Sequence, residues 1–210
     1  MQLFGKLIIK SKSKIIEFLN KELTGRIASI DENGFPQIIP MNFVFLDDVI
    51  YMHSHVKGEK IDNIKRDSKV GFEVDKNLEF LPSYFSDPDD ASLADTFYIS
   101  IVIKGEAKLV EDDDEKVLAL NGLMRKYQPE GKYLPMTTNM PVLDHTAVIK
   151  VIPKEMNGKY KIGQTMSKKE KIEMANKILK RNTNTAKETL EIMGFEIIDS
   201  KAVLKTDVKW

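Results

Sequence analysis

The sequence predicts a mainly β fold, a six-stranded antiparallel barrel with flanking helices and a helical C-terminal tail. Apolar residues alternate with period two in several segments, which is typical of half-buried strands. The connections between most of these segments are too short for the crossover helices that a parallel sheet requires. Six segments carry the strand pattern: 26–30, 35–45, 50–53, 70–74, 97–110 and 145–151. We expect one domain over residues 1–210, with the barrel at about 20–165 and the tail at about 166–210.

Composition excludes several classes of protein. Thirty-two basic and thirty-two acidic residues cancel, so no bulk positive charge favours nucleic acid or a membrane surface as a partner. The chain contains no cysteine, which rules out disulfides, iron–sulfur clusters and thiolate zinc sites. No apolar run reaches the length of a membrane span, and residues 1–6 lead into no signal-peptide core. We therefore expect a soluble, cytoplasmic protein.

The first half of the predicted barrel is organised around a tight hairpin. Before it, apolar residues at helical spacing in 7–23 predict a helix that covers one end of the barrel, with Ser13 as its cap. Asn33-Gly34 predicts the hairpin turn between the first two strands. Pro36 and Pro40 then interrupt the second strand. Because proline donates no backbone hydrogen bond, this strand must lie at an edge or break.

The second half is expected to alternate long strands with helices. Residues 75–96 predict an irregular loop over a pocket or a partner subunit, and Gly105 predicts a bulge or kink in the long strand. The acidic run 111–115 indicates the N-terminus of a helix rather than a metal site. After the last core strand we expect an extension at 154–161 with a turn at Asn157-Gly158. The tail has a capping box at Ser167–Glu170 and a second helix at 185–193 that ends at Gly194.

The stretch from Tyr51 to Lys60 predicts a phosphate site. A strand ending in His53 and Ser54 is followed by Lys57, Gly58 and, at a helix start, Lys60. Anions bind well at such a junction because unpaired backbone N–H groups and the positive end of the helix dipole point at them.

Several segments together resemble one known family. They are 25–28, 31–36, 39–43, 51–54, 58–60, 98–105, 115–116, 158–159 and 162–164. In this order they are similar to the pyridoxamine 5′-phosphate oxidase-like flavoproteins, and especially to the 5-nitroimidazole resistance (Nim-type) branch. Two departures from the oxidase itself are Glu59, where an arginine is expected, and Ser100, where a glutamine is expected. Both weaken the case for pyridoxamine phosphate oxidation and fit the Nim-type branch better.

The resemblance implies an FMN-binding split β-barrel and a homodimer with one FMN per subunit in the cleft between chains. It places the flavin ring along the segment 37–42, where the backbone would offer hydrogen bonds, and Lys60 on the flavin phosphate. Ser100 would reach the flavin from across the sheet. The residues expected at the cofactor are Ile39, Pro40, Met41, Asn42, His53, Ser54, Lys57, Gly58, Lys60 and Ser100.

Each of these residues also has a simpler interpretation. Lys60 could be a solvated helix lysine, and Ser54 could cap the turn. His53 and His55 could form a metal pair, but no third ligand lies near them in the sequence, so we expect no metal site. In the Nim-type branch the residue matching His53 lies near flavin and substrate, which makes His53 a candidate proton donor. A structural role at the strand end remains an equal alternative.

We therefore expect an FMN-dependent oxidoreductase that acts on a small molecule, with a nitroaromatic as one acceptor that the resemblance suggests. The alternative is a module that binds haem, or flavin, without flavin turnover; a haem would need an axial ligand such as His53, His55 or His145. A third alternative is an empty barrel that serves as a dimeric interaction domain.

Overall fold

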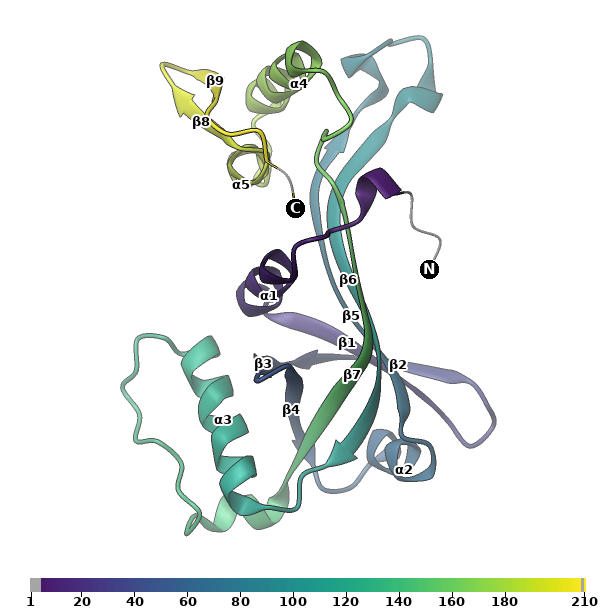
Figure 1. The fold of residues 1–210 in the computed structure, drawn as a ribbon, viewed down its shortest axis with the longest axis vertical. Helices are drawn as coiled ribbons and strands as arrows, with labels where there is room; N and C mark the ends of the chain where they lie inside the picture. Colours follow the sequence, from purple (N-terminus) through teal and green to yellow (C-terminus); the bar gives the residue numbers. More distant parts are fainter. Residues whose placement is uncertain (1–4, 209) are drawn as a thin grey trace. The chain divides into compact units, whose positions relative to one another are not determined.

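The computed structural model describes residues 5–208 and 210, so the expectation for residues 1–4 lies outside it. Its main feature is a seven-stranded, mainly antiparallel sheet with the strand order β2-β1-β5-β6-β7-β4-β3 (Figure 1). The strands are β1 Thr24–Ile30, β2 Pro36–Asn42, β3 Val44–Leu46, β4 Val49–His55, β5 Lys69–Leu81, β6 Asp95–Leu109 and β7 Thr146–Lys161. This sheet and its flanking helices confirm the predicted split-barrel fold class.

The strand count is a correction, because the sequence predicted six strands. The segment 35–45 divides into β2 and β3 at Phe43, whose side chain is fully buried. The Phe43 N–H donates to the Tyr127 hydroxyl at 2.8 Å, and that hydroxyl donates to the Phe43 carbonyl at 3.1 Å. A side chain thus satisfies the backbone groups that a continuous strand would have paired. The edge position predicted for the proline-containing strand is confirmed, since within the described residues β2 pairs with β1 alone.

Contacts between residues divide the chain into two compact units. The first unit contains the residues up to Ser11 together with 75–100 and 158–210. The second contains 12–74 and 101–157. The division falls within β5, β6 and β7 rather than at one linker, and the single-domain expectation stays a prediction.

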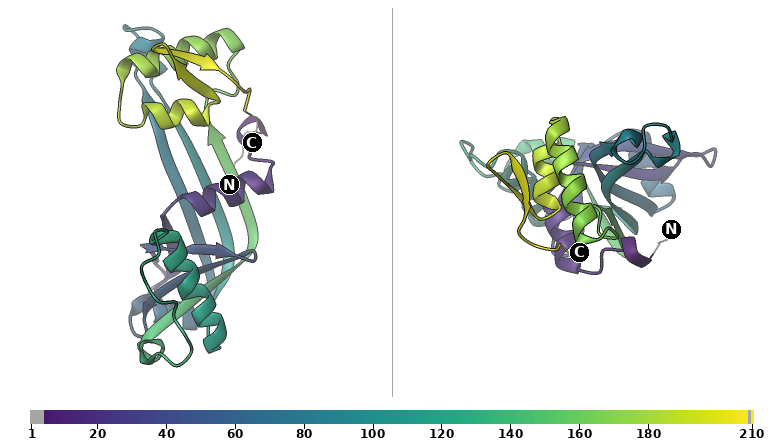
Figure 2. Two further views of the ribbon diagram at one scale, coloured as in Figure 1. Left: turned by 90° about the vertical axis from the view of Figure 1, so that its left-hand side faces the viewer. Right: turned by 90° about the horizontal axis from the view of Figure 1, so that it is seen from above.

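Three α-helices belong to the second unit: α1 Lys12–Lys21, α2 Glu59–Arg66 and α3 Asp113–Tyr127. Ser13 lies inside the first turn of α1, so its predicted capping role is wrong. The acidic run is confirmed as a helix start, because the Asp112 side chain accepts a hydrogen bond from the Glu115 N–H at 2.8 Å. Figures 1 and 2 show α3 beside β3 and β4, against which it contributes Leu120 and Leu123 to a buried apolar cluster.

The C-terminal part of the first unit contains strands as well as helices, which corrects the purely helical tail. The helices α4 Lys168–Arg181 and α5 Ala186–Ile192 are followed by the hairpin β8 Phe195–Ile198 and β9 Lys201–Leu204. The hairpin lies beside α4 (Figure 2). The Ala202 N–H donates to Asn176 Oδ1 of this helix at 3.1 Å. The predicted capping box at Ser167 is confirmed, as is the C-terminal glycine Gly194, with φ 87°. Among the described residues no helix is long and apolar enough to cross a membrane.

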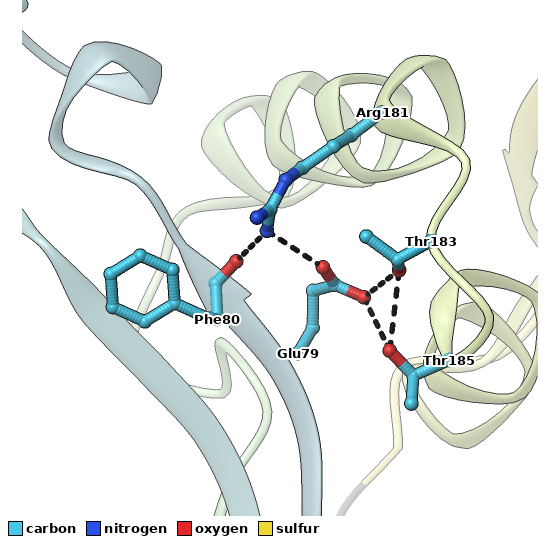
Figure 3. Close-up of polar contacts among 5 residues, drawn as sticks. All are labelled: Glu79, Phe80, Arg181, Thr183 and Thr185. Atoms are coloured by element: carbon cyan, nitrogen blue, oxygen red, sulfur yellow. Dashed lines mark hydrogen bonds and ion pairs between the residues drawn. The ribbon is translucent and has the colours of Figure 1, made fainter.

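A buried carboxylate joins β5 to the end of α4 within the first unit (Figure 3). Glu79 is 3% exposed, and its carboxylate accepts hydrogen bonds from Arg181 at 3.1 Å, Thr183 at 2.6 Å and Thr185 at 2.8 Å. Arg181 also donates to the Phe80 carbonyl at 2.5 Å. A carboxylate removed from water in this way needs such partners, and here they include one cation and two hydroxyls.

Strands β5, β6 and β7 extend further than the sequence predicted, because they pair with strands that are remote in the chain. The loop predicted at 75–96 is shorter, because β5 continues to Leu81 and β6 begins at Asp95. The turn predicted at Asn157-Gly158 is wrong, since β7 runs through both residues. Gly105 lies inside a continuous β6, where an added Cβ would stand 2.7 Å from the Ile152 carbonyl oxygen. Close approach of the β7 backbone gives a reason for glycine at this position, and the expected bulge or kink stays a prediction.

Candidate functional site

The predicted phosphate site lies where β4 gives way to α2. In β4, His53 pairs with Val148 and Ser54 with Ala147 of β7. The imidazole of His55 accepts a hydrogen bond from the Lys57 N–H at 3.2 Å, which shapes the connection. Gly58 then takes φ 137° at the N-cap of α2, and an added Cβ would meet nothing within 4 Å. The backbone at this junction is therefore open to a ligand.

Lys60 is a half-buried cation in the first turn of α2. Its Nζ lies 3.4 Å from Met41 Sδ, and a thioether is only a weak acceptor. Among the described residues no carboxylate pairs with this ammonium group. Burial lowers the pKa of Lys60 below its ordinary value. A cation that is partly removed from water and lacks an anionic partner is well suited to bind a phosphate.

The hairpin of β1 and β2 holds α2 in place through a buried amide. Asn63 is 2% exposed, and its Nδ2 donates to Ser29 Oγ at 3.3 Å and to Gln37 Oε1 at 3.4 Å. Arg66 donates to Asn63 Oδ1 at 2.8 Å and to the Ile30 carbonyl at 2.6 Å. The sequence analysis did not identify Asn63 as a residue that positions α2. An amide beside the apolar positions Ile61 and Ile64 was the available signal.

Glu59 occupies a different part of the helix surface from Lys60. It lines a pocket of about 310 Å³ together with Asp62, Arg66 and the hairpin turn 31–33. Lys60 instead contacts Met41, near the end of β2. The carboxylate that replaces the arginine of the oxidase pattern is therefore not the partner of the candidate phosphate lysine.

The remaining predicted cofactor residues lie in three places: on β2, at the junction of β4 and α2, and on β6. Side chains alternate along β2, so Ile39 and Met41 are half-buried while Pro40 and Asn42 are exposed. His53, Lys57 and Gly58 are exposed, and Ser54 is half-buried. The structure brings Met41 and Lys60 into contact. Ser100 is half-buried on β6 at the boundary of the first unit, and its role stays a prediction.

Metal ligands do not gather at this site. Within residues 5–208 and 210, no three histidine, aspartate or glutamate side chains lie close enough together to hold a metal ion. The functional groups that the junction does offer are an ammonium, a hydroxyl, an imidazole and backbone amides, which suit a phosphorylated organic molecule.

An antiparallel split barrel with a half-buried lysine at a glycine-led strand–helix junction defines the class of protein. A comparison with family models then matches residues 11–160 to the family described as pyridoxamine 5′-phosphate oxidase. The match covers well over half of the chain, which therefore belongs to this family and confirms the resemblance found in the sequence.

Solved structures with the same fold include three informative neighbours. A candidate 5-nitroimidazole antibiotic resistance protein from Bacteroides thetaiotaomicron is 25% identical, with a TM-score of 0.62 over 73% of this chain and 86% of that chain. The flavocytochrome Anf3 from Azotobacter vinelandii is 16% identical, with a TM-score of 0.65 over 77% and 72%. An FAD and haem binding protein from Mycobacterium smegmatis is 14% identical, with a TM-score of 0.62 over 73% and 72%. A comparison with curated proteins finds no match.

Proposed function

We propose that this protein is an FMN-dependent oxidoreductase acting on a small molecule. The observation that carries the proposal is the half-buried ammonium of Lys60, without a carboxylate partner among the described residues, at a glycine-led helix start. Membership in the family described as pyridoxamine 5′-phosphate oxidase supports the same assignment. The proposal makes two claims: the protein binds a flavin, and this flavin is FMN.

The residues of the junction have separate roles in this proposal. Lys60 pairs with the phosphate, and Gly58 allows the backbone to approach it closely. The Ser54 hydroxyl is a further hydrogen-bond donor at the end of β4. The backbone of β2 from Ile39 to Asn42 is the platform for the ring, because an edge strand has backbone groups that no second strand uses.

FMN, when bound, supplies the electron or hydride transfer. His53 is the candidate catalytic residue, an exposed imidazole at the end of β4 that holds or delivers a proton to the substrate. A nitroaromatic acceptor is the substrate class favoured by the 25% identical neighbour from Bacteroides. The electron donor in this proposal is a reduced nicotinamide.

The proposal includes a cytoplasmic homodimer with FMN at the subunit interface. Its support is the exposure of the predicted cofactor residues, since His53, Pro40 and Asn42 all lie on open surface of the single chain. A second subunit would cover these residues and shield the ring from water.

Absorption spectroscopy of the purified protein tests the assignment. We expect a flavin spectrum that bleaches when NADH or NADPH is added under argon. Titration of flavin-free protein with FMN, FAD and riboflavin then tests the phosphate site, because riboflavin has no phosphate and should bind least tightly. A Soret band instead of a flavin spectrum would favour the haem-binding alternative. A colourless protein that takes up no added flavin would contradict the proposal.

A further inference from the structure

Two pockets in the first unit share a wall made by Gln164 and Asp207. The aromatic pocket has a volume of about 420 Å³, and its lining includes Lys6, Lys10, Tyr160, Gln164, Asp207 and Trp210. The lysine pocket has a volume of about 280 Å³, and its lining includes Gln164, Met166, Lys168, Lys171, Lys205 and Asp207. The two volumes together fall in the range that small-molecule sites occupy. None of these residues belongs to the proposed FMN site.

The aromatic pocket presents a flat apolar surface. The rings of Tyr160 and Trp210 are nearly parallel, with an interplanar angle of 12° and centroids 5.8 Å apart. The backbone N–H of Trp210 donates to the Tyr160 hydroxyl at 3.4 Å, and the backbone carbonyl of Trp210 accepts from the backbone N–H of Lys10 at 3.2 Å. Tyr160 is buried, whereas Trp210 is half-exposed. A planar ligand would therefore stack on the indole of Trp210.

Gln164 fixes the wall between the two pockets. Its Oε1 accepts a hydrogen bond from the Ile162 N–H at 2.9 Å. Its Nε2 donates to the Tyr160 carbonyl at 2.8 Å and to the Lys6 carbonyl at 3.2 Å. Because protein groups already use both donors and one acceptor position of the amide, Gln164 is mainly a structural residue of the pocket.

Positive charge predominates around the two pockets. Lys171 pairs with Asp207 at 2.7 Å, and Lys205 pairs with Glu196 at 3.1 Å. Three further lysines, Lys6, Lys10 and Lys168, have no carboxylate partner among the described residues. The first turn of α4 is already occupied by the capping box of Ser167 and Glu170. The attraction for an anion thus comes from the lysine side chains rather than from the helix end.

From this combination we propose that the two pockets form one binding site for a nucleotide, with its base on Trp210 and its phosphates among the lysines. A flat aromatic face beside an excess of ammonium groups matches the two chemical parts of a nucleotide. This is a second ligand site. It shares no residue with the proposed FMN site, and it can be tested separately from FMN binding.

Calorimetric titration of the full-length protein with ADP tests this site, and tryptophan fluorescence locates the ligand. Trp210 is the single tryptophan of the chain, so a base stacked on it should change the emission. We expect saturable heat and a matching saturable change in emission with ADP. Adenosine, which lacks phosphate, and pyrophosphate, which lacks a base, should both bind more weakly.

A matched pair of substitutions in the first turn of α4 assigns the phosphate contact. K168E should weaken ADP binding about tenfold or more, since a charge-assisted contact is replaced by repulsion. K169E makes the same charge change on the neighbouring residue, whose 87% exposed side chain does not line the pocket, and should bind ADP as the wild type does. Glutamate near a helix N-terminus is favourable, so both variants should fold.

The results with ADP distinguish this nucleotide site from the proposed FMN site. Absence of saturable heat with ADP would overturn the proposal. An equal loss of ADP affinity in K168E and K169E would also overturn it. So would a loss of ADP affinity in K60A, because K60A should weaken the binding of flavin alone. FMN retention in K168E should equal that of the wild type whether or not ADP binds.

Discussion

Lys60 Nζ lies 3.4 Å from Met41 Sδ, which places the candidate phosphate lysine of α2 against the strand predicted to hold the flavin ring. The two residues are 19 positions apart in the chain, and the intervening segment includes β3 and β4. Asn63 and Gln37 form a second link between the same helix and strand at 3.4 Å. The two predicted halves of the cofactor site, ring platform and phosphate lysine, are therefore neighbours in one unit.

Substitution of Lys60 tests the phosphate contact. K60M keeps the apolar stem beside Met41 but removes the charge, so we expect the dissociation constant for FMN to rise about tenfold or more. The affinity for riboflavin should stay unchanged, since it has no phosphate to lose. K65M on the exposed side of the same helix is the control and should bind FMN as the wild type does. Wild-type FMN affinity in K60M would show that another group holds the phosphate.

Lys126 gives the stability of the protein a specific pH dependence. Burial lowers the pKa of Lys126 from 10.5 to about 8, while nearby Glu22 opposes the shift. The Lys126 ammonium also lies 3.6 Å from the centre of the Phe43 ring and donates to the Leu19 carbonyl at 2.9 Å. These contacts favour the charged form and moderate the effect of burial.

The sign of the effect follows from proton linkage. Between pH 8 and 10.5 the unfolded chain holds more protons on Lys126 than the folded chain, so its contribution to the free energy of unfolding rises with pH. The contribution is complete above 10.5 and is lost as the pH falls through 8. In K126M this increase should be absent, whereas the exposed neighbour variant R125M should retain it. Chemical unfolding across this pH range measures the difference, and parallel curves for wild type and K126M would contradict the lowered pKa.

Gly105 and Gly71 form a matched pair for testing close strand approach. A Cβ at Gly105 would lie 2.7 Å from the Ile152 carbonyl oxygen and 2.8 Å from Val151 Cγ1. A Cβ at Gly71 would meet only Ala28 Cβ, at an ordinary 3.6 Å. We expect G105A to lower the free energy of unfolding by about 1–3 kcal/mol through overpacking, and G71A to change it little. Equal effects in urea unfolding would show that the β6–β7 approach can relax.

The buried carboxylate of Glu79 should be important for the stability of the first unit. E79Q keeps the shape but removes the charge opposite Arg181, and its amide nitrogen cannot accept the hydrogen bonds that a carboxylate oxygen accepts (Figure 3). We expect a loss of about 3 kcal/mol, the lower end for a broken buried pair, because Arg181 is partly exposed.

Two further variants complete this test. E173Q, on an exposed side chain with a 3.9 Å ion pair, should change stability little. In a double-mutant cycle with R181M, the effects of the two substitutions should be non-additive. Additive effects would show that Arg181 does not interact energetically with Glu79.

Local patterns identified much of the fold and the centre of the site. Gly34 at the hairpin turn, with φ 86°, and the capping box at Ser167 act within a few residues, so the sequence shows them directly. Gly58 and Lys60 marked the strand–helix junction for the same reason. The partner of Lys60 was not visible, because it is a methionine on a strand rather than a nearby charge. Asn63 was missed because a buried amide is recognised only from the groups that surround it.

The sequence by itself determined the approximate positions of most barrel strands and helices, which strand must be an edge, and where a glycine joins β4 to α2. These properties depend on side-chain periodicity, on proline and glycine geometry and on local capping. Tertiary structure decided how far β5, β6 and β7 extend, that Phe43 divides one predicted strand into two, and that Glu79 meets Arg181 from 102 residues away. Strand length and buried ion pairs depend on partners that are remote in sequence, and only folding brings those partners together.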